Sequence, residues 1–252
     1  WWQTLKTGAA QAAFSNRGEW ETVAPGGRLS LGRLAGSPLP PLLAAHGAPA
    51  LKPLFTTRFV RNLRTVEVGR AVVEVALDRG EVLAGRGAAA RRLPLLELEL
   101  ELKSGPPRAL FKLARRLMAG ESDRAVRTLP LLPLTESKAA RGYRLLSSQP
   151  PAPAKASAKG FVARLSADQT ADAALRQVVG HGTEVLLANV QGIAGHEDPE
   201  FVHQARVALR RMRSAVRLWR KHSRFPRRLA RELQWIGREL GAARDADVLV
   251  TE

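Results

Sequence analysis

The residues with the clearest chemical potential are three glutamates in residues 95–105, LLELELELKSG. Strict alternation of leucine and glutamate predicts a β-strand, in which same-face neighbours lie about 7 Å apart. Glu97, Glu99 and Glu101 therefore share one face. At that spacing two carboxylates repel by about 0.6 kcal/mol in water and by about 2 kcal/mol at an effective dielectric of about 20. A half-buried row of this kind therefore requires cations.

A surface strand with a wetted polar side would show the same alternation, and the strand alone leaves that alternative open. Its surroundings favour a charged interior. Residues 71–85 repeat the pattern, with Glu74 and Asp78 on one face and valines on the other, and the neighbouring segments are rich in arginine and lysine. We predict that the acids line an interior of both charges and that the leucines face an amphipathic helix at residues 106–118.

The remaining elements of the first half must position these charges. Period-two patterns predict strands at residues 1–6, 17–23 and 54–68, and residues 71–85 are interpreted as a hairpin that turns at Arg79-Gly80. Strands with one charged and one apolar face, and a helix on the apolar side, predict an antiparallel β-barrel with a polar lumen.

The second half has a different character. Residues 147–160, SSQPPAPAKASAKG, have no period and predict a linker. Beyond them, a capping-box pattern at residues 166–169 and prolines 199 and 226 each open an apolar helical period. The predicted fold class is therefore α+β, with a barrel in residues 1–146 and an α-helical bundle in residues 161–252.

One predicted helix, at residues 201–222, carries an arginine at every third or fourth position. The stripe consists of Arg206, Arg210, Arg213, Arg217 and Arg220. Like charges four residues apart each cost a few tenths of a kcal/mol, so a bound anion would relieve the helix. A solvated basic face is the alternative. Trp219 and Trp235 fall on apolar stripes, which predicts core positions for both.

Composition points to a polyanionic partner, and charge alone does not choose among nucleic acid, polyphosphate, phosphorylated metabolites and an anionic membrane. Forty lysines and arginines against 23 acids give a net charge of +17, and the chain has no cysteine. No apolar run approaches the roughly 18 residues that a bilayer requires. We expect a cytoplasmic protein without membrane partners. Nucleic acid is compatible with the charge, but the sequence contains no recognition motif for it.

Several motifs resemble known families. Residues 52–61 (KPLFTTRFVR), the run VEVALDRGEVLAG, the strand ELELELKSG and the ending SKAARGY at residues 137–143 resemble the CYTH domain of bacterial inorganic triphosphatases, which are triphosphate tunnel metalloenzymes. Residues 203–219 (HQARVALRRMRSAVRLW) and the following LGAARDADVL resemble the CHAD domain, a helical module that commonly follows CYTH and is associated with polyphosphate binding.

The CYTH resemblance implies an eight-stranded barrel whose tunnel binds triphosphate through basic side chains and Mg²⁺ or Mn²⁺ through acids. The implied phosphate-binding cations are Lys6, Arg17, Arg61 and Lys138. The implied metal-binding acids are Glu19, Glu21, Glu74, Asp78, Glu97, Glu99 and Glu101. The CHAD resemblance implies that polyphosphate binds the arginine stripe with His203 at the same end, although an ordinary histidine is the alternative there.

One departure from the CYTH pattern is the Glu-x-Glu-x-Lys strand that opens the family, which nothing in residues 1–16 matches. We therefore expect a chain truncated at both ends, with the first strand before Trp1. The expected function is metal-dependent hydrolysis of inorganic triphosphate beside a polyphosphate-binding module. A non-catalytic polyphosphate-binding or targeting protein is the alternative, and adenylate cyclase or thiamine triphosphatase activity also occurs within the family.

Overall fold

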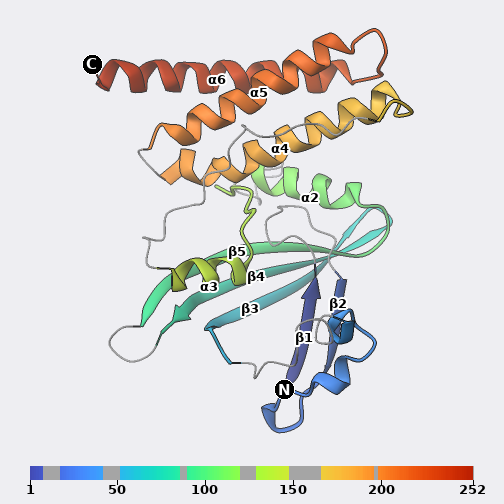
Figure 1. The fold of residues 1–252 in the computed structure, drawn as a ribbon, viewed down its shortest axis with the longest axis vertical. Helices are drawn as coiled ribbons and strands as arrows, with labels where there is room; N and C mark the ends of the chain where they lie inside the picture. The colour runs from blue at the N-terminus through green and yellow to red at the C-terminus, as the bar shows by residue number, and fades with distance from the viewer. Residues whose placement is uncertain are drawn as a thin grey trace. The chain divides into compact units, whose positions relative to one another are not determined.

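The computed structural model describes residues 1–7, 18–41, 52–85, 90–119, 129–147, 166–195 and 198–251, with side chains described as far as residue 241. The predicted linker lies outside this part of the chain except for Ser147. The chain forms two compact units. One comprises residues 1–63, 76–99 and 136–148, and the other comprises residues 64–75, 100–135 and 149–252. Figure 1 shows the order of the elements along the chain.

The first two strands form an antiparallel pair of their own. β1 (Trp2–Thr7) pairs with β2 (Gly18–Val23), and the register places Thr4 opposite Glu21 and Lys6 opposite Glu19. The buried Gln3 side chain exchanges two hydrogen bonds with the Ser30 backbone, at 2.7 and 2.8 Å, and so ties β1 to the segment that follows β2. The strands predicted at residues 1–6 and 17–23 are therefore confirmed.

Three long strands form the second sheet, in the order β3 (Phe55–Val68), β4 (Ala71–Ala84) and β5 (Arg91–Ser104). The turn between β3 and β4 contains Gly69, whose φ of +65° is one that glycine adopts readily.

The hairpin predicted to turn at Arg79-Gly80 is wrong, because β4 continues through both residues. Gly80 is needed there for a close approach of strands. A Cβ atom on it would lie 2.0 Å from the carbonyl oxygen of Arg58 and 2.5 Å from the Cα of Phe59. The sequence pattern does not distinguish this use of glycine from a turn.

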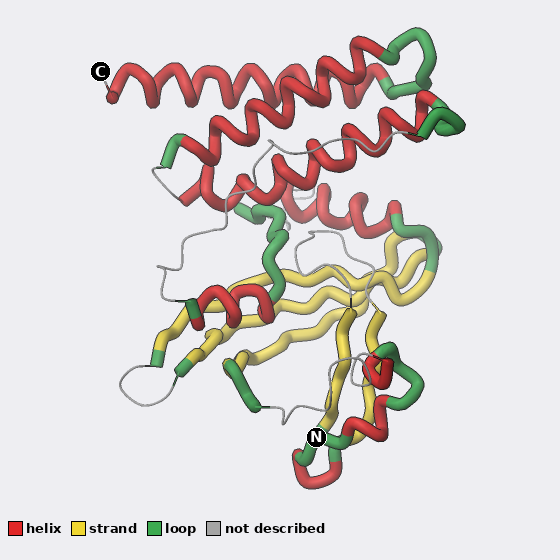
Figure 2. Tube along the Cα trace, viewed as in Figure 1, coloured by secondary structure: helices red, strands yellow, loops and turns green. Residues whose placement is uncertain are grey.

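The mixed α+β class with antiparallel sheets is confirmed, but the described strands do not close into a barrel (Figure 2). They form one sheet of two strands and one of three. The barrel therefore stays a prediction from the family resemblance.

Two helices pack on the three-stranded sheet. α2 (Arg108–Ala119) confirms the helix predicted after β5. It packs through Leu113 on a cluster that includes Val73 and the leucines 100 and 102 of β5, as the alternation of that strand predicts. α3 (Lys138–Leu146) packs through Leu145 on Val82 and Leu95. Because Leu95 lies two residues before Glu97, α3 covers the acidic face of β5.

The C-terminal half is helical. α4 (Ala171–Gly195) packs against α5 (Glu200–Leu218), and α5 packs against α6 (Arg227–Thr251) (Figure 2). α4 and α5 approach closely at Gly192, where a Cβ atom would lie 2.2 Å from the Phe201 ring. No helix in the described ranges is both long and apolar enough to cross a bilayer.

Two predictions about these helices are wrong. α5 ends at Leu218 and not at residue 222, so Arg220 lies in the turn beyond it. Trp235, predicted to be a core residue, is 52% exposed. Apolar periodicity identifies one side of a helix, but it does not identify what covers that side.

Candidate functional site

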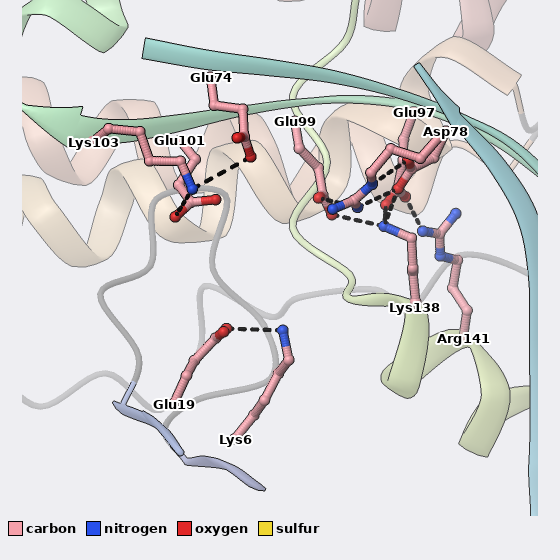
Figure 3. A network of polar contacts seen from close by, with 11 residues as sticks. Lys6, Glu19, Glu74, Asp78, Glu97, Glu99, Glu101, Lys103, Lys138 and Arg141 are labelled. Carbon is pink, nitrogen blue, oxygen red and sulfur yellow. Dashed lines mark hydrogen bonds and ion pairs between the residues drawn. The ribbon is translucent and has the colours of Figure 1, made fainter. Parts of the chain in front are cut away.

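A compact group of charges lies on the face of the sheet that α3 covers. Three acids, Asp78 on β4 with Glu97 and Glu99 on β5, place carboxylate oxygens within 4.8 Å of one another. Three cations contact them. One is Arg61 on β3, and the other two are Lys138 and Arg141 on α3 (Figure 3). We call these six residues the charge cluster. Neighbouring strands and one helix are sufficient to assemble it.

Arg61 binds two of the acids. Its Nε and Nη2 atoms donate to Asp78 at 2.7 and 2.6 Å, and Nη2 also donates to Glu99 at 2.7 Å. The Asp78 side chain is fully buried. Burial raises the pKa of Asp78, but hydrogen bonds from Arg61 and Lys138 outweigh burial and hold that pKa below its usual range. The hydrogen bond to Asp78 likewise raises the pKa of Arg61. Both groups are therefore charged at neutral pH.

Lys138 contacts all three acids. Its Nζ lies 2.8 Å from Asp78 and 2.7 Å from Glu99, and it also donates to Oε1 of Glu97. Burial lowers the pKa of Lys138, but its three carboxylate partners raise it by more, so the amine stays protonated. Ser137 caps α3 by accepting a hydrogen bond from the Ala140 backbone at 3.1 Å, which fixes where the helix begins.

An aromatic ring adjoins two of the cations. The centroid of the Phe59 ring lies 5.4 Å from Cζ of Arg61 and 5.2 Å from Nζ of Lys138, both within reach of a cation–π attraction. Phe59 shares the face of Arg61 because the two residues are two positions apart on β3. The ring therefore helps to hold the two cations beside each other.

The other predicted site residues of the first half form separate pairs. Glu74 and Glu101 share Lys103, at 3.3 and 2.9 Å (Figure 3). Lys6 pairs with Glu19 at 2.8 Å, both about half exposed, and Glu21 accepts a hydrogen bond from Thr4. Arg17 lies outside the described residues.

Sequence reasoning identified five of the six members of the charge cluster and missed Arg141. It also missed Phe59, which adjoins the cluster, and Lys103, which pairs with Glu74 and Glu101. Arg141 follows Lys138 by three residues on a helix, a spacing that puts both on one face. Lys103 shares a strand face with Glu101. Period and spacing could therefore have identified two of the three. Phe59 carries no such signal, because an aromatic residue in a strand is ordinary.

The predicted arginine stripe on α5 divides into two groups. Arg206 donates to the Leu240 carbonyl at 3.0 Å, and the Arg213 guanidinium lies against Gly237, so both are turned toward α6. Arg210 and Arg217 are exposed, as is His203. A shallow depression of about 430 Å³ lies at the C-terminal end of α5 and is lined by Ser214, Arg217, Leu218, Arg220 and Lys221.

A charge cluster of this kind on an antiparallel sheet is suited to binding an anion together with a cation. The sequence model of the CYTH domain matches residues 1–143, and that of the CHAD domain matches residues 177–252. The chain therefore belongs to the CYTH family, with a CHAD domain following.

One curated relative is an inorganic triphosphatase from Haemophilus influenzae. It is 37% identical over 103 residues, which are 39% of this chain and 25% of the relative. The chain thus matches about a quarter of the length of that relative.

The donor set fits a divalent metal ion. Mg²⁺ and Mn²⁺ prefer oxygen ligands, and Asp78, Glu97 and Glu99 each offer a carboxylate oxygen within one small volume. Each of these acids already has a cationic side chain as partner, so a metal would displace a lysine or an arginine from it. The displaced cations could then bind an anion that arrives with the metal.

Proposed function

We propose that the protein hydrolyses inorganic triphosphate to pyrophosphate and phosphate, with Mg²⁺ or Mn²⁺ held by Asp78, Glu97 and Glu99. The observation that carries this proposal is the interleaving of three acids and three cations in one cluster. Membership of the CYTH family and the similarity to an inorganic triphosphatase support it.

Binding of metal and triphosphate requires the acids and cations of the charge cluster to exchange their ion-pair partners. Triphosphate brings several negative charges, and the metal brings two positive ones. Arg61 presents a planar fork of donors that matches phosphate oxygens, and Lys138 presents a mobile ammonium. With substrate and metal bound, Arg61 and Lys138 would hold phosphate oxygens, and Asp78, Glu97 and Glu99 would hold the metal. Each carboxylate would then keep a positive partner in the metal, and each released cation would gain a negative one in the triphosphate.

Hydrolysis of a phosphate anhydride depends mainly on positioning and on stabilisation of charge. A metal held by Asp78, Glu97 and Glu99 would supply polarisation of the terminal phosphoryl group and a water molecule of lowered pKa. The protein side chains orient the triphosphate: Arg61 and Lys138 hold its oxygens, and in the wider proposal Lys6 and Arg17 add further contacts. Glu19, Glu21, Glu74 and Glu101 are further metal-binding acids that the family resemblance implies.

The test compares two variants of the same type. Glu99→Gln should lower Mg²⁺- or Mn²⁺-dependent hydrolysis of triphosphate by about 100-fold or more, because it removes a charged metal ligand. Glu99 is 47% exposed, so the fold should survive. Glu81→Gln is the matched control, since Glu81 pairs with Arg92 away from the cluster. Near-normal turnover of the Glu99 variant would place the metal elsewhere.

The helical half supports a second proposal, that it binds polyphosphate. The observation that favours it is the exposure of Arg210 and Arg217, seven residues apart on one side of α5. Arg206 and Arg213 contribute to packing with α6, and the arginines exposed to solvent are the ones free to bind a polyanion. If triphosphate hydrolysis is absent, this binding alone would be the function.

A further inference from the structure

Arg141 differs from the other cations of the charge cluster in its burial. Its side chain is 9% exposed, against 18% for Lys138 and 35% for Arg61. Its partner Glu97 is 8% exposed. Within the described residues the Nε atom of Arg141 is buried and has no hydrogen-bond partner, so the guanidinium depends on its Nη2 contact with Glu97.

The two oxygens of Glu97 are divided between two cations. Lys138 contacts Oε1, whereas Arg141 contacts Oε2 (Figure 3). Lys138 also contacts Asp78 and Glu99, so it can lose one carboxylate and keep others. For Arg141, loss of Glu97 would leave a buried guanidinium without a counter-ion among the residues that the structure describes, which is far more costly than breaking an exposed pair.

The position of Arg141 is fixed by the packing of α3. The next residue, Gly142, lies so close to the Phe55 ring that a Cβ atom would approach it to 2.4 Å. One residue further, Tyr143 contacts the same ring edge-on, with centroids 5.2 Å apart. Arg144 then forms a two-point ion pair with Glu136 at 2.8 and 2.7 Å. Contacts on consecutive residues therefore leave the backbone at Arg141 little freedom.

From this geometry we infer that Arg141 is a positioning residue. It stays on Oε2 of Glu97 when metal and triphosphate bind, so Glu97 offers only Oε1 to the metal. Lys138 is the cation that leaves Glu97 and moves to phosphate. The inference rests on the proposed function. It gives different roles to two cations that share one face of α3: Lys138 contacts the substrate, and Arg141 acts only through Glu97.

The test uses the full chain with the variants Arg141→Gln, Arg141→Lys, Lys138→Gln and Arg144→Gln. Mn²⁺ binding is measured by the electron paramagnetic resonance signal of the free ion. Binding of tripolyphosphate without metal is measured by calorimetry, and thermal unfolding is recorded for each variant. Arg144→Gln is the matched control, because it removes another partly buried ion pair of α3 without touching Glu97.

Arg141→Gln should weaken Mn²⁺ binding by about 10- to 100-fold, as expected for a partner that orients a metal ligand, and Arg141→Lys should restore part of it. Metal-free tripolyphosphate binding should change less than about twofold in both. Lys138→Gln should weaken that binding by about tenfold. Arg144→Gln should lower the unfolding temperature while leaving both affinities unchanged.

Two results would overturn the inference. If either Arg141 variant weakens metal-free tripolyphosphate binding as much as Lys138→Gln does, Arg141 contacts phosphate. If both Arg141 variants bind Mn²⁺ as the unmodified chain does, the residue serves stability alone. Should Arg141→Gln fail to fold, the lysine variant decides by the same two criteria. Failure of the proposed function itself would appear differently, as no Mn²⁺ binding by the unmodified chain.

Discussion

At the scale of single residues, Asp78 is the acid on which the charge cluster depends. It is fully buried and contacts both Arg61 and Lys138. Asp78→Asn should therefore lower the free energy of unfolding at pH 7 by about 3 kcal/mol, because it removes one partner from buried ion pairs. Urea unfolding of the metal-free protein measures this. Glu81→Gln, which breaks a more exposed pair with Arg92, should cost less than about 1 kcal/mol.

The difference in unfolding free energy between Asp78→Asn and the unmodified protein should depend on pH. The folded-state pKa of Asp78 lies below its ordinary value, chiefly because hydrogen bonds from Arg61 and Lys138 outweigh burial. Its contribution to stability is therefore complete above the unfolded pKa of about 3.9 and is lost as pH falls through the folded pKa. The gap between Asp78→Asn and the unmodified protein should narrow below about pH 4. An equal gap at pH 3 and pH 7 would contradict this origin.

Prediction of single residues from the sequence succeeded where the alternation of side chains along a strand decides which face a residue occupies. Alternation placed Glu97 and Glu99 on one face, and the structure brings them to Asp78 and Arg61. It failed where position depends on a helix packed over the sheet. Arg141 is buried because of where α3 packs on the sheet, and the sequence of α3 alone does not predict that position.

At the scale of elements, the packing of α3 against Phe55 can be tested at Gly142. Alanine normally stabilises a helix relative to glycine by up to about 1 kcal/mol. Gly142→Ala should instead destabilise by about 1 to 3 kcal/mol, because its Cβ would overlap the Phe55 ring. It should also weaken tripolyphosphate binding, since α3 carries Lys138. Calorimetry and urea unfolding measure both effects.

Gly180 on α4 provides the control for this comparison, because a Cβ atom there would meet nothing within 4 Å. Gly180→Ala should therefore stabilise the protein by roughly 0.5 to 1 kcal/mol. If Gly142→Ala proves as stable as Gly180→Ala, α3 is not held against Phe55 as the structure indicates.

Element-level prediction from the sequence was right for long periodic segments and wrong where glycine or tryptophan has two uses. Residues 106–118 and 54–68 have clear periods, and both elements are confirmed. Gly80 permits a close approach of strands in β4 and not a turn. Trp235 has a helical apolar period, yet it is largely exposed. The role of Gly80 and the exposure of Trp235 both depend on neighbouring elements, about which the local sequence pattern carries no information.

At the scale of the whole molecule, the net charge of +17 is unevenly compensated. In the charge cluster three cations face three acids. On α5, by contrast, Arg210 and Arg217 are exposed within a run that has no acid between residues 201 and 231. Under the functions proposed above, the two regions would take different ligands: a small anion that arrives with a metal, and a long polyanion bound by charge.

The last prediction tests the second of these ligands. Arg210 and Arg217 lie about 10 Å apart along the helix, so a flexible phosphate chain can contact both at once. The double variant Arg210→Gln with Arg217→Gln should weaken binding of long-chain polyphosphate and reduce its dependence on salt by about two released ions. The control double variant, Arg58→Gln with Arg79→Gln, removes the same charge from exposed positions on the sheet. Binding isotherms between about 50 and 200 mM salt compare the two, and duplex DNA serves as competitor. Equal losses in the two double variants, or DNA binding as tight as that of polyphosphate, would reduce the stripe to a generic basic surface.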